Sequence, residues 1–135
     1  WVLRRPTLPA NRDGWHRDGA LMGEGTNSLN MWIAANHCGG ETGAPGMDLF
    51  PQRLTKILGD GDGGAIFTWS VSDHGIKNAH LKNTIIAPVF EAGDALCFDH
   101  FLLHRTQHDN DFIRPRYAME TWVFGKKPSP KIRCP

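Results

Sequence analysis

A histidine and an aspartate stand two residues apart in the segment Trp15-His16-Arg17-Asp18-Gly19. Residues i and i+2 of a β-strand point to the same face, so His16 and Asp18 would present an imidazole and a carboxylate side by side. One metal ion suits this pair, because two histidines and one carboxylate form the ligand set that leaves coordination positions open in non-haem Fe(II) oxygenases. The alternative for an isolated His-x-Asp is a turn or a surface ion pair. The metal hypothesis therefore needs a second histidine.

A second histidine is available at position 104. The histidines at 100, 104 and 108 could line one helical face and bind zinc, but the turn at Gly93-Asp94 and the strand-like residues 95–98 argue against a helix there. Residues 102–106 instead predict a strand, on which His104 and Thr106 share a face. This strand would bring an imidazole and a hydroxyl to the same side.

Short strands separated by turn-rich loops are predicted along the whole chain. They begin near Trp15 and cover residues 28–35, 65–71, 84–87, 95–98, 102–106 and 116–124, with both faces of the last strand mostly covered. Proline and glycine predict that residues 1–14 are turn and loop and that residues 38–51 are one long loop. No convincing ten-residue amphipathic helix is present, so the pattern predicts an all-β sandwich or barrel in a single domain.

The composition excludes several classes of partner. Fifteen basic and fourteen acidic residues are scattered along the 135-residue chain, which favours neither nucleic acid nor a membrane surface as a partner. No apolar run approaches the ~20 residues of a membrane helix, and no signal peptide is recognisable. Three widely spaced cysteines predict neither a disulfide framework nor a cysteine zinc site, so we expect reduced thiols and a cytoplasmic location. The sequence does not indicate an oligomeric state.

Five segments, taken in order, resemble the phytanoyl-CoA dioxygenase-like family of Fe(II)- and 2-oxoglutarate-dependent oxygenases. They are Trp-His-Arg-Asp-Gly at 15–19, Leu-Asn-Met-Trp-Ile-Ala at 29–34, Ala-Gly-Asp-Ala-Leu-Cys-Phe-Asp at 92–99, Leu-Leu-His-Arg-Thr at 102–106 and Arg-Pro-Arg-Tyr-Ala at 114–118. Each segment alone is a weak signal, whereas the ordered set covers most of the chain. The resemblance implies a double-stranded β-helix, the fold of jelly rolls and cupins, with the metal in its mouth.

The resemblance also implies roles for individual residues. It makes His16, Asp18 and His104 the iron ligands and catalytic residues, and it makes Arg116, assisted by Thr106, the partner of the distal carboxylate of 2-oxoglutarate. A guanidinium is suited to this role because its planar fork can donate two parallel hydrogen bonds to a carboxylate.

Two assignments stay open within this resemblance. Arg114 competes with Arg116, because the two follow His104 by ten and twelve residues, on either side of the family's usual spacing; the Arg-Pro-Arg pattern favours Arg116, since Pro115 breaks the strand before it. Asn30 and Trp32 share a strand face and could line a substrate pocket, although a tryptophan in such a strand is as often part of the core.

The implied activity is hydroxylation of an unactivated carbon of a small-molecule or lipid-like substrate, with 2-oxoglutarate and O2 consumed and succinate and CO2 released. Asp18 favours hydroxylation over halogenation, because related halogenases replace this carboxylate with a small residue. The alternatives are a cupin-type metalloenzyme that does not use 2-oxoglutarate and a non-catalytic β-barrel module that binds a metal or a small molecule. Arg116 and Thr106 discriminate between the first alternative and the oxygenase.

Family members carry a substantial N-terminal part before the His-x-Asp strand, whereas fourteen residues precede Trp15 here. Residues 1–135 are therefore expected to form a single, partial dioxygenase domain that lacks this part. Missing strands would leave unpaired edges and an open core, so we expect these residues alone to be unstable and inactive.

Overall fold

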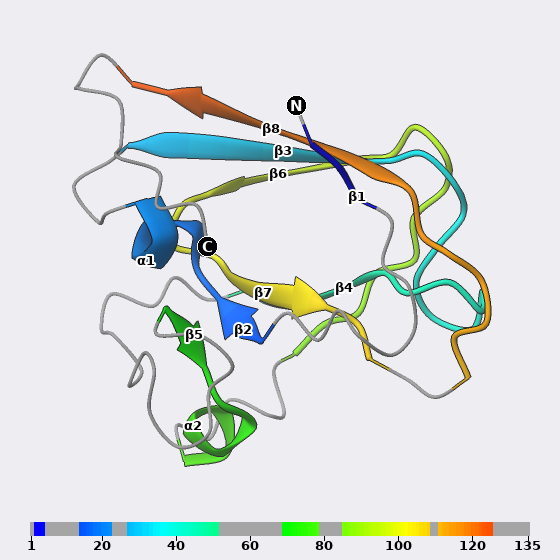
Figure 1. Ribbon diagram of the computed structural model, residues 1–135, viewed down its shortest axis with the longest axis horizontal. Coiled ribbons are helices and arrows are strands. Elements are labelled where there is room, and N and C mark those ends of the chain that lie inside the picture. The colour runs from blue at the N-terminus through cyan, green and yellow to red at the C-terminus, as the bar shows by residue number, and fades with distance from the viewer. Residues whose placement is uncertain are drawn as a thin grey trace.

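Two antiparallel sheets form the upper and lower layers of the molecule in Figure 1. The computed structural model describes residues 2–4, 14–22, 27–51, 69–78, 85–108 and 111–125. Sheet A has the strand order β1 (Val2–Arg4), β8 (Ala118–Phe124), β3 (Ser28–Ala34), β6 (Ala95–Asp99). Sheet B has the order β4 (Met47–Phe50), β7 (Leu103–Thr106), β2 (Trp15–His16), β5 (Ser70–Val71). Two short helices, α1 (Asp18–Met22) and α2 (Asp73–Asn78), accompany these strands.

The two faces of sheet B have different chemistry. Apolar side chains on the outer face form a cluster with Ile76 of α2, and its members on the strands are Trp15, Phe50, Val71 and Leu103. Because side chains alternate along a strand, the residues next to Trp15 and Leu103 point to the inner face instead. These residues are His16 and His104, so burying the outer cluster against α2 directs both imidazoles between the sheets.

The main core lies between the sheets, on the inner face of sheet A. Trp32, Phe98 and Ala118 of sheet A pack in one cluster with Met47 and Leu49 of sheet B. The outer face of sheet A differs, since its large apolar side chains Leu29, Met119 and Val123 are 46%, 39% and 61% exposed. The prediction that both faces of the last strand are covered is therefore wrong.

The predicted all-β architecture is confirmed, and most of the predicted strands lie where the sequence placed them. The strands expected at 28–35, 95–98 and 102–106 appear as β3, β6 and β7, and the last strand begins two residues later than predicted, at Ala118. Of the strand predicted at 65–71, only Ser70–Val71 is observed, and residues 65–68 lie outside the described residues. Neither α1 nor α2, the helices of the described part, is long and apolar enough to cross a bilayer.

Three predictions about loops and strands are wrong. Residues 2–4, expected as loop, form β1 through pairing with β8, and residues 47–50, also expected as loop, form β4 through pairing with β7. Both strands are short, and their hydrogen-bond partners are distant in sequence, so local composition gave no signal of them. Conversely, the strand predicted at 84–87 is reduced among its described residues to a single bridge between Ile86 and Leu49.

Candidate metal centre

The two histidines of sheet B lie directly opposite each other. His16 on β2 and His104 on β7 are register partners, and their ring centroids are 4.3 Å apart. The Nδ1 atom of His16 is 2.8 Å from the carbonyl oxygen of Gly14, and that of His104 is 3.0 Å from the carbonyl oxygen of Leu102. A carbonyl only accepts hydrogen bonds, so in the neutral form of each ring Nδ1 carries the proton and Nε2 has the lone pair that a metal ion would bind.

Asp18 reaches the histidines from a helix. The strand ends at His16, and Asp18 is the first residue of α1, so the prediction that His16 and Asp18 share a strand face is wrong. The carboxylate is nevertheless buried beside the imidazoles, with Oδ1 3.7 Å from Nε2 of His104. One ligand atom from each of His16, Asp18 and His104 lies within 4.8 Å of the other two. Two imidazole nitrogens and a carboxylate oxygen suit Fe(II) and related divalent ions.

Hydrogen bonds from sheet A hold the other oxygen of Asp18. The amide nitrogen of Asn30 on β3 and the indole nitrogen of Trp122 on β8 each donate to Oδ2 at 2.8 Å. Burial alone would raise the pKa of this carboxyl, but the nearby His104, the hydrogen bond from Asn30, His16 and the hydrogen bond from Trp122 together hold the pKa below its ordinary value. Asp18 is therefore ionised at neutral pH, as a metal ligand must be.

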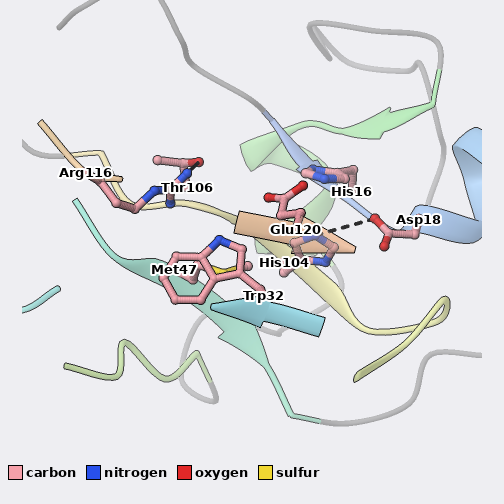
Figure 2. Close-up of a pocket in the computed structure, with 8 residues that line it drawn as sticks. All are labelled: His16, Asp18, Trp32, Met47, His104, Thr106, Arg116 and Glu120. Carbon is pink, nitrogen blue, oxygen red and sulfur yellow. Dashed lines mark hydrogen bonds and ion pairs between the residues drawn. The ribbon is translucent and has the colours of Figure 1, made fainter. Parts of the chain in front are cut away.

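A pocket of about 310 Å³, counting the part open to solvent, adjoins these three side chains. Figure 2 shows His16 and Asp18 at one side of this pocket and Thr106 and Arg116 at the other. We call the first side, with His104, the metal end and the second the anchor end. The lining residues are His16, Asp18, Trp32, Met47, His104, Thr106, Arg116 and Glu120.

Arg116 occupies the anchor end as a buried cation. Its side chain is 2% exposed, Nη1 donates to the carbonyl oxygen of Gly46 at 3.1 Å, and Nη2 donates to Oγ1 of Thr106 at 3.3 Å. Arg114 lies elsewhere: it is exposed, and its guanidinium donates to the carbonyl oxygen of Thr42 on the surface loop. Of the two competing arginines, only Arg116 lines the pocket.

The two candidate substrate-pocket residues of β3 have different surroundings. Trp32 lines the pocket and is 1% exposed, and its indole nitrogen has no hydrogen-bond partner among the described residues. Figure 2 shows this nitrogen on the edge of the ring that faces the other pocket residues. Asn30 does not line the pocket; instead it donates a hydrogen bond to Asp18, which does.

Sequence reasoning missed two residues of the last strand. Glu120 lines the pocket and Trp122 donates to Asp18. Both lie on the face that the two-residue alternation shares with Arg116, so the same pattern that places Arg116 near a site could have found them. Gly46, which accepts a hydrogen bond from Arg116, gave no signal because only its backbone takes part.

No protein-family model and no curated protein sequence matches this chain. Among solved structures, the chain is similar to EctD from S. alaskensis in its apo form, with a TM-score of 0.59, 16% identity and coverage of 89% of this chain and 41% of that one. It is also similar to two structures of EvdO2 from Micromonospora carbonacea var. aurantiaca, one of which is complexed with 2-oxoglutarate. Each has a TM-score of 0.59 and 18% identity, and the match covers 96% of this chain and 53% of that one. The chain thus spans about half the length of these structures.

At these identities the similarity shows the fold alone. Two facing antiparallel sheets with these structural matches define the double-stranded β-helix, or jelly roll, that was predicted. This fold hosts many chemistries, so the function has to be argued from the pocket and its side chains.

Proposed function

We propose that the chain belongs to an Fe(II)- and 2-oxoglutarate-dependent dioxygenase that hydroxylates an unactivated carbon of a small-molecule substrate. Residues 1–135 would form a single domain of this enzyme, or a part of one. The observation that carries the proposal is one pocket with a His-Asp-His group at its metal end and a buried arginine at its anchor end. A metal-only cupin would need the first feature and not the second.

The residues fit the two groups that this reaction requires. His16 and His104 would hold Fe(II) through Nε2, and Asp18 would hold it through a carboxylate oxygen. Arg116 would bind the distal carboxylate of 2-oxoglutarate, with the hydroxyl of Thr106 next to it. The indole N–H of Trp32, buried in the pocket without a partner among the described residues, is a further donor suited to an anionic ligand.

When bound, Fe(II) and 2-oxoglutarate supply the oxidising chemistry: O2 is consumed, a C–H bond of the substrate becomes C–OH, and 2-oxoglutarate is split into succinate and CO2. The protein's contribution is orientation and charge. The hydrogen bonds of both histidines to backbone carbonyls fix which nitrogen faces the metal. The buried guanidinium compensates the charge of a bound carboxylate in surroundings from which most water is excluded.

An anaerobic titration tests the proposal. Metal-free protein is titrated with Fe(II) and then with 2-oxoglutarate, and the weak visible charge-transfer band of the chelate is followed. We expect the band in the wild type, a weakened band in Arg116→Ala, and a normal band in Arg114→Ala, which removes the same charge at the protein surface. Iron binding without the band would instead support a cupin-type enzyme that does not use 2-oxoglutarate. A folded protein that binds no iron would support a non-catalytic module.

A further inference from the structure

Asp18 differs from the two histidines in how it is held. His16 and His104 belong to paired strands, and each makes a hydrogen bond to the backbone two residues before it. Asp18 lies beyond the end of β2, at the start of a five-residue helix. Its own chain segment therefore supplies no sheet that fixes the direction of the carboxylate, and side chains from elsewhere must do so.

Sheet A supplies them. Asn30 and Trp122 are cross-strand partners in the β3–β8 register, and both side chains reach Asp18 from the inner face of the sheet. Their N–H groups converge on a single oxygen, Oδ2 of Asp18, at 2.8 Å each. The other oxygen, Oδ1, is the one that lies 3.7 Å from Nε2 of His104. The carboxylate is thus divided into one oxygen that accepts from sheet A and one that faces the imidazoles.

The surroundings of Asn30 indicate that its amide is arranged for this contact. An ionised carboxylate only accepts hydrogen bonds, so the amide nitrogen, and not its oxygen, must face Asp18. The amide oxygen Oδ1 of Asn30 is then left buried with no partner among the described residues. A buried acceptor without a partner is unfavourable, so the orientation of the amide is explained by its contact with Asp18.

We propose that Asn30 and Trp122 act as positioning residues that make Asp18 a metal ligand through Oδ1 alone. This inference rests on the proposed metal centre and adds the sheet A side chains that orient its third ligand. With Oδ2 engaged by two donors, the carboxylate cannot turn to place both oxygens on the metal. A ligand that occupies a single coordination position leaves the others for 2-oxoglutarate and O2.

Co(II) titration of the purified protein tests this inference without any turnover. Trp122→Phe keeps an aromatic ring and removes the N–H, and Asn30→Leu keeps the approximate shape and removes both polar groups. We expect each variant to bind Co(II) about tenfold more weakly than the wild type, the usual effect of losing a partner of a metal ligand. We also expect an altered visible Co(II) spectrum, because Oδ2 becomes available to the metal.

Met119→Leu is the control, since it changes a side chain of the same strand β8 that is 39% exposed on the outer face of sheet A. It should bind Co(II) with wild-type affinity and spectrum. Circular dichroism of each metal-free variant identifies one that fails to fold, in which case the other variant decides. Wild-type affinity and spectrum in the folded variants would overturn the inference and leave the proposed function standing. No Co(II) binding by the folded wild type would overturn both.

Discussion

The two ends of the pocket are held by different parts of the polypeptide. At the metal end, side chains of sheet A hold Asp18: Asn30 and Trp122 donate to its carboxylate, which faces the imidazoles of sheet B. At the anchor end, a loop carbonyl helps to hold the arginine: the carbonyl oxygen of Gly46 accepts from Arg116, next to the hydroxyl of Thr106. The metal end should therefore respond to changes of polar groups, and the anchor end to changes of backbone shape.

The backbone at the anchor end is fixed by close packing. The carbonyl of Gly46 also accepts from the backbone nitrogen of Gln107, whose side-chain oxygen accepts from the nitrogen of Gly46. A Cβ atom on Gly46 would lie 2.7 Å from Cα of Gly39, and Gly39 itself has φ of 90°. Glycine is thus required at both Gly39 and Gly46, where the loop packs against itself next to Arg116.

The largest expected effect is the loss of a ligand at the metal end. Asp18→Ala removes the only carboxylate of the His-Asp-His group, so metal affinity should fall by more than roughly 100-fold, beyond the effect of losing an outer partner. Isothermal titration with Co(II) or Mn(II) measures it. Asp94→Ala, which removes an exposed carboxylate that caps a turn, is the control and should bind normally. Equal affinity in wild type and Asp18→Ala would exclude this residue as a ligand.

The second-largest effect is expected from a change of backbone packing at the anchor end. Gly46→Ala forces the loop away from Gly39 and should lower the free energy of unfolding by about 1–3 kcal/mol, as overpacking commonly does. It should also weaken 2-oxoglutarate binding, because the carbonyl that orients Arg116 moves. Urea unfolding measures the first effect. Gly125→Ala is the control, since a Cβ atom there meets its nearest neighbour at an ordinary 3.5 Å; similar losses in both variants would contradict the prediction.

A smaller effect is expected from the hydroxyl beside Arg116. Thr106→Val keeps the shape of the side chain and removes the acceptor of the Nη2 hydrogen bond. One hydrogen bond contributes about 0.5–1.5 kcal/mol, so the dissociation constant of 2-oxoglutarate should rise about two- to tenfold. The anaerobic charge-transfer titration measures it. Fe(II) affinity should stay unchanged, and an equal fall in Fe(II) affinity would show that the two ends are not separate.

The smallest effect concerns thiol reactivity. Burial raises the pKa of Cys38, although Arg116 opposes this rise, whereas Cys97 is exposed. In a Cys134→Ser background, a thiol reagent should label Cys97 quickly and Cys38 only as the protein opens. Because Cys38 precedes Gly39, its labelling reports on the anchor end, and Gly46→Ala should accelerate it. Rapid labelling of Cys38 in the wild type would show that this end is not close-packed.

Sequence reasoning reached the features that are local in the chain. The strand around His104 and the alternation within β3 are set by neighbouring residues, and these strands were predicted. Features that depend on pairing between distant segments were missed. Met47 joins a strand because it pairs with Thr106, and Trp122 reaches Asp18 because it pairs with Asn30. No spacing within either segment encodes those partners.

Asp18 illustrates a different limit. The His-x-Asp spacing correctly suggested that the two side chains lie together, but the reason given was wrong, since the strand ends before Asp18. Here the two side chains are brought together by a strand that ends at His16 and a helix that begins at Asp18. The motif therefore predicts proximity better than it predicts secondary structure.

The register pairing of His16 with His104 has a consequence for how the chain folds. A slip of β2 by one residue against β7 would turn every side chain of β2 to the opposite face, so that His16 would point outward and Trp15 would enter the space between the sheets. Such a misfolded chain would keep most of its backbone hydrogen bonds and lose the pair of facing imidazoles. An ion that binds both imidazoles would stabilise only the correctly paired chain, and so would act as a check on strand alignment during folding.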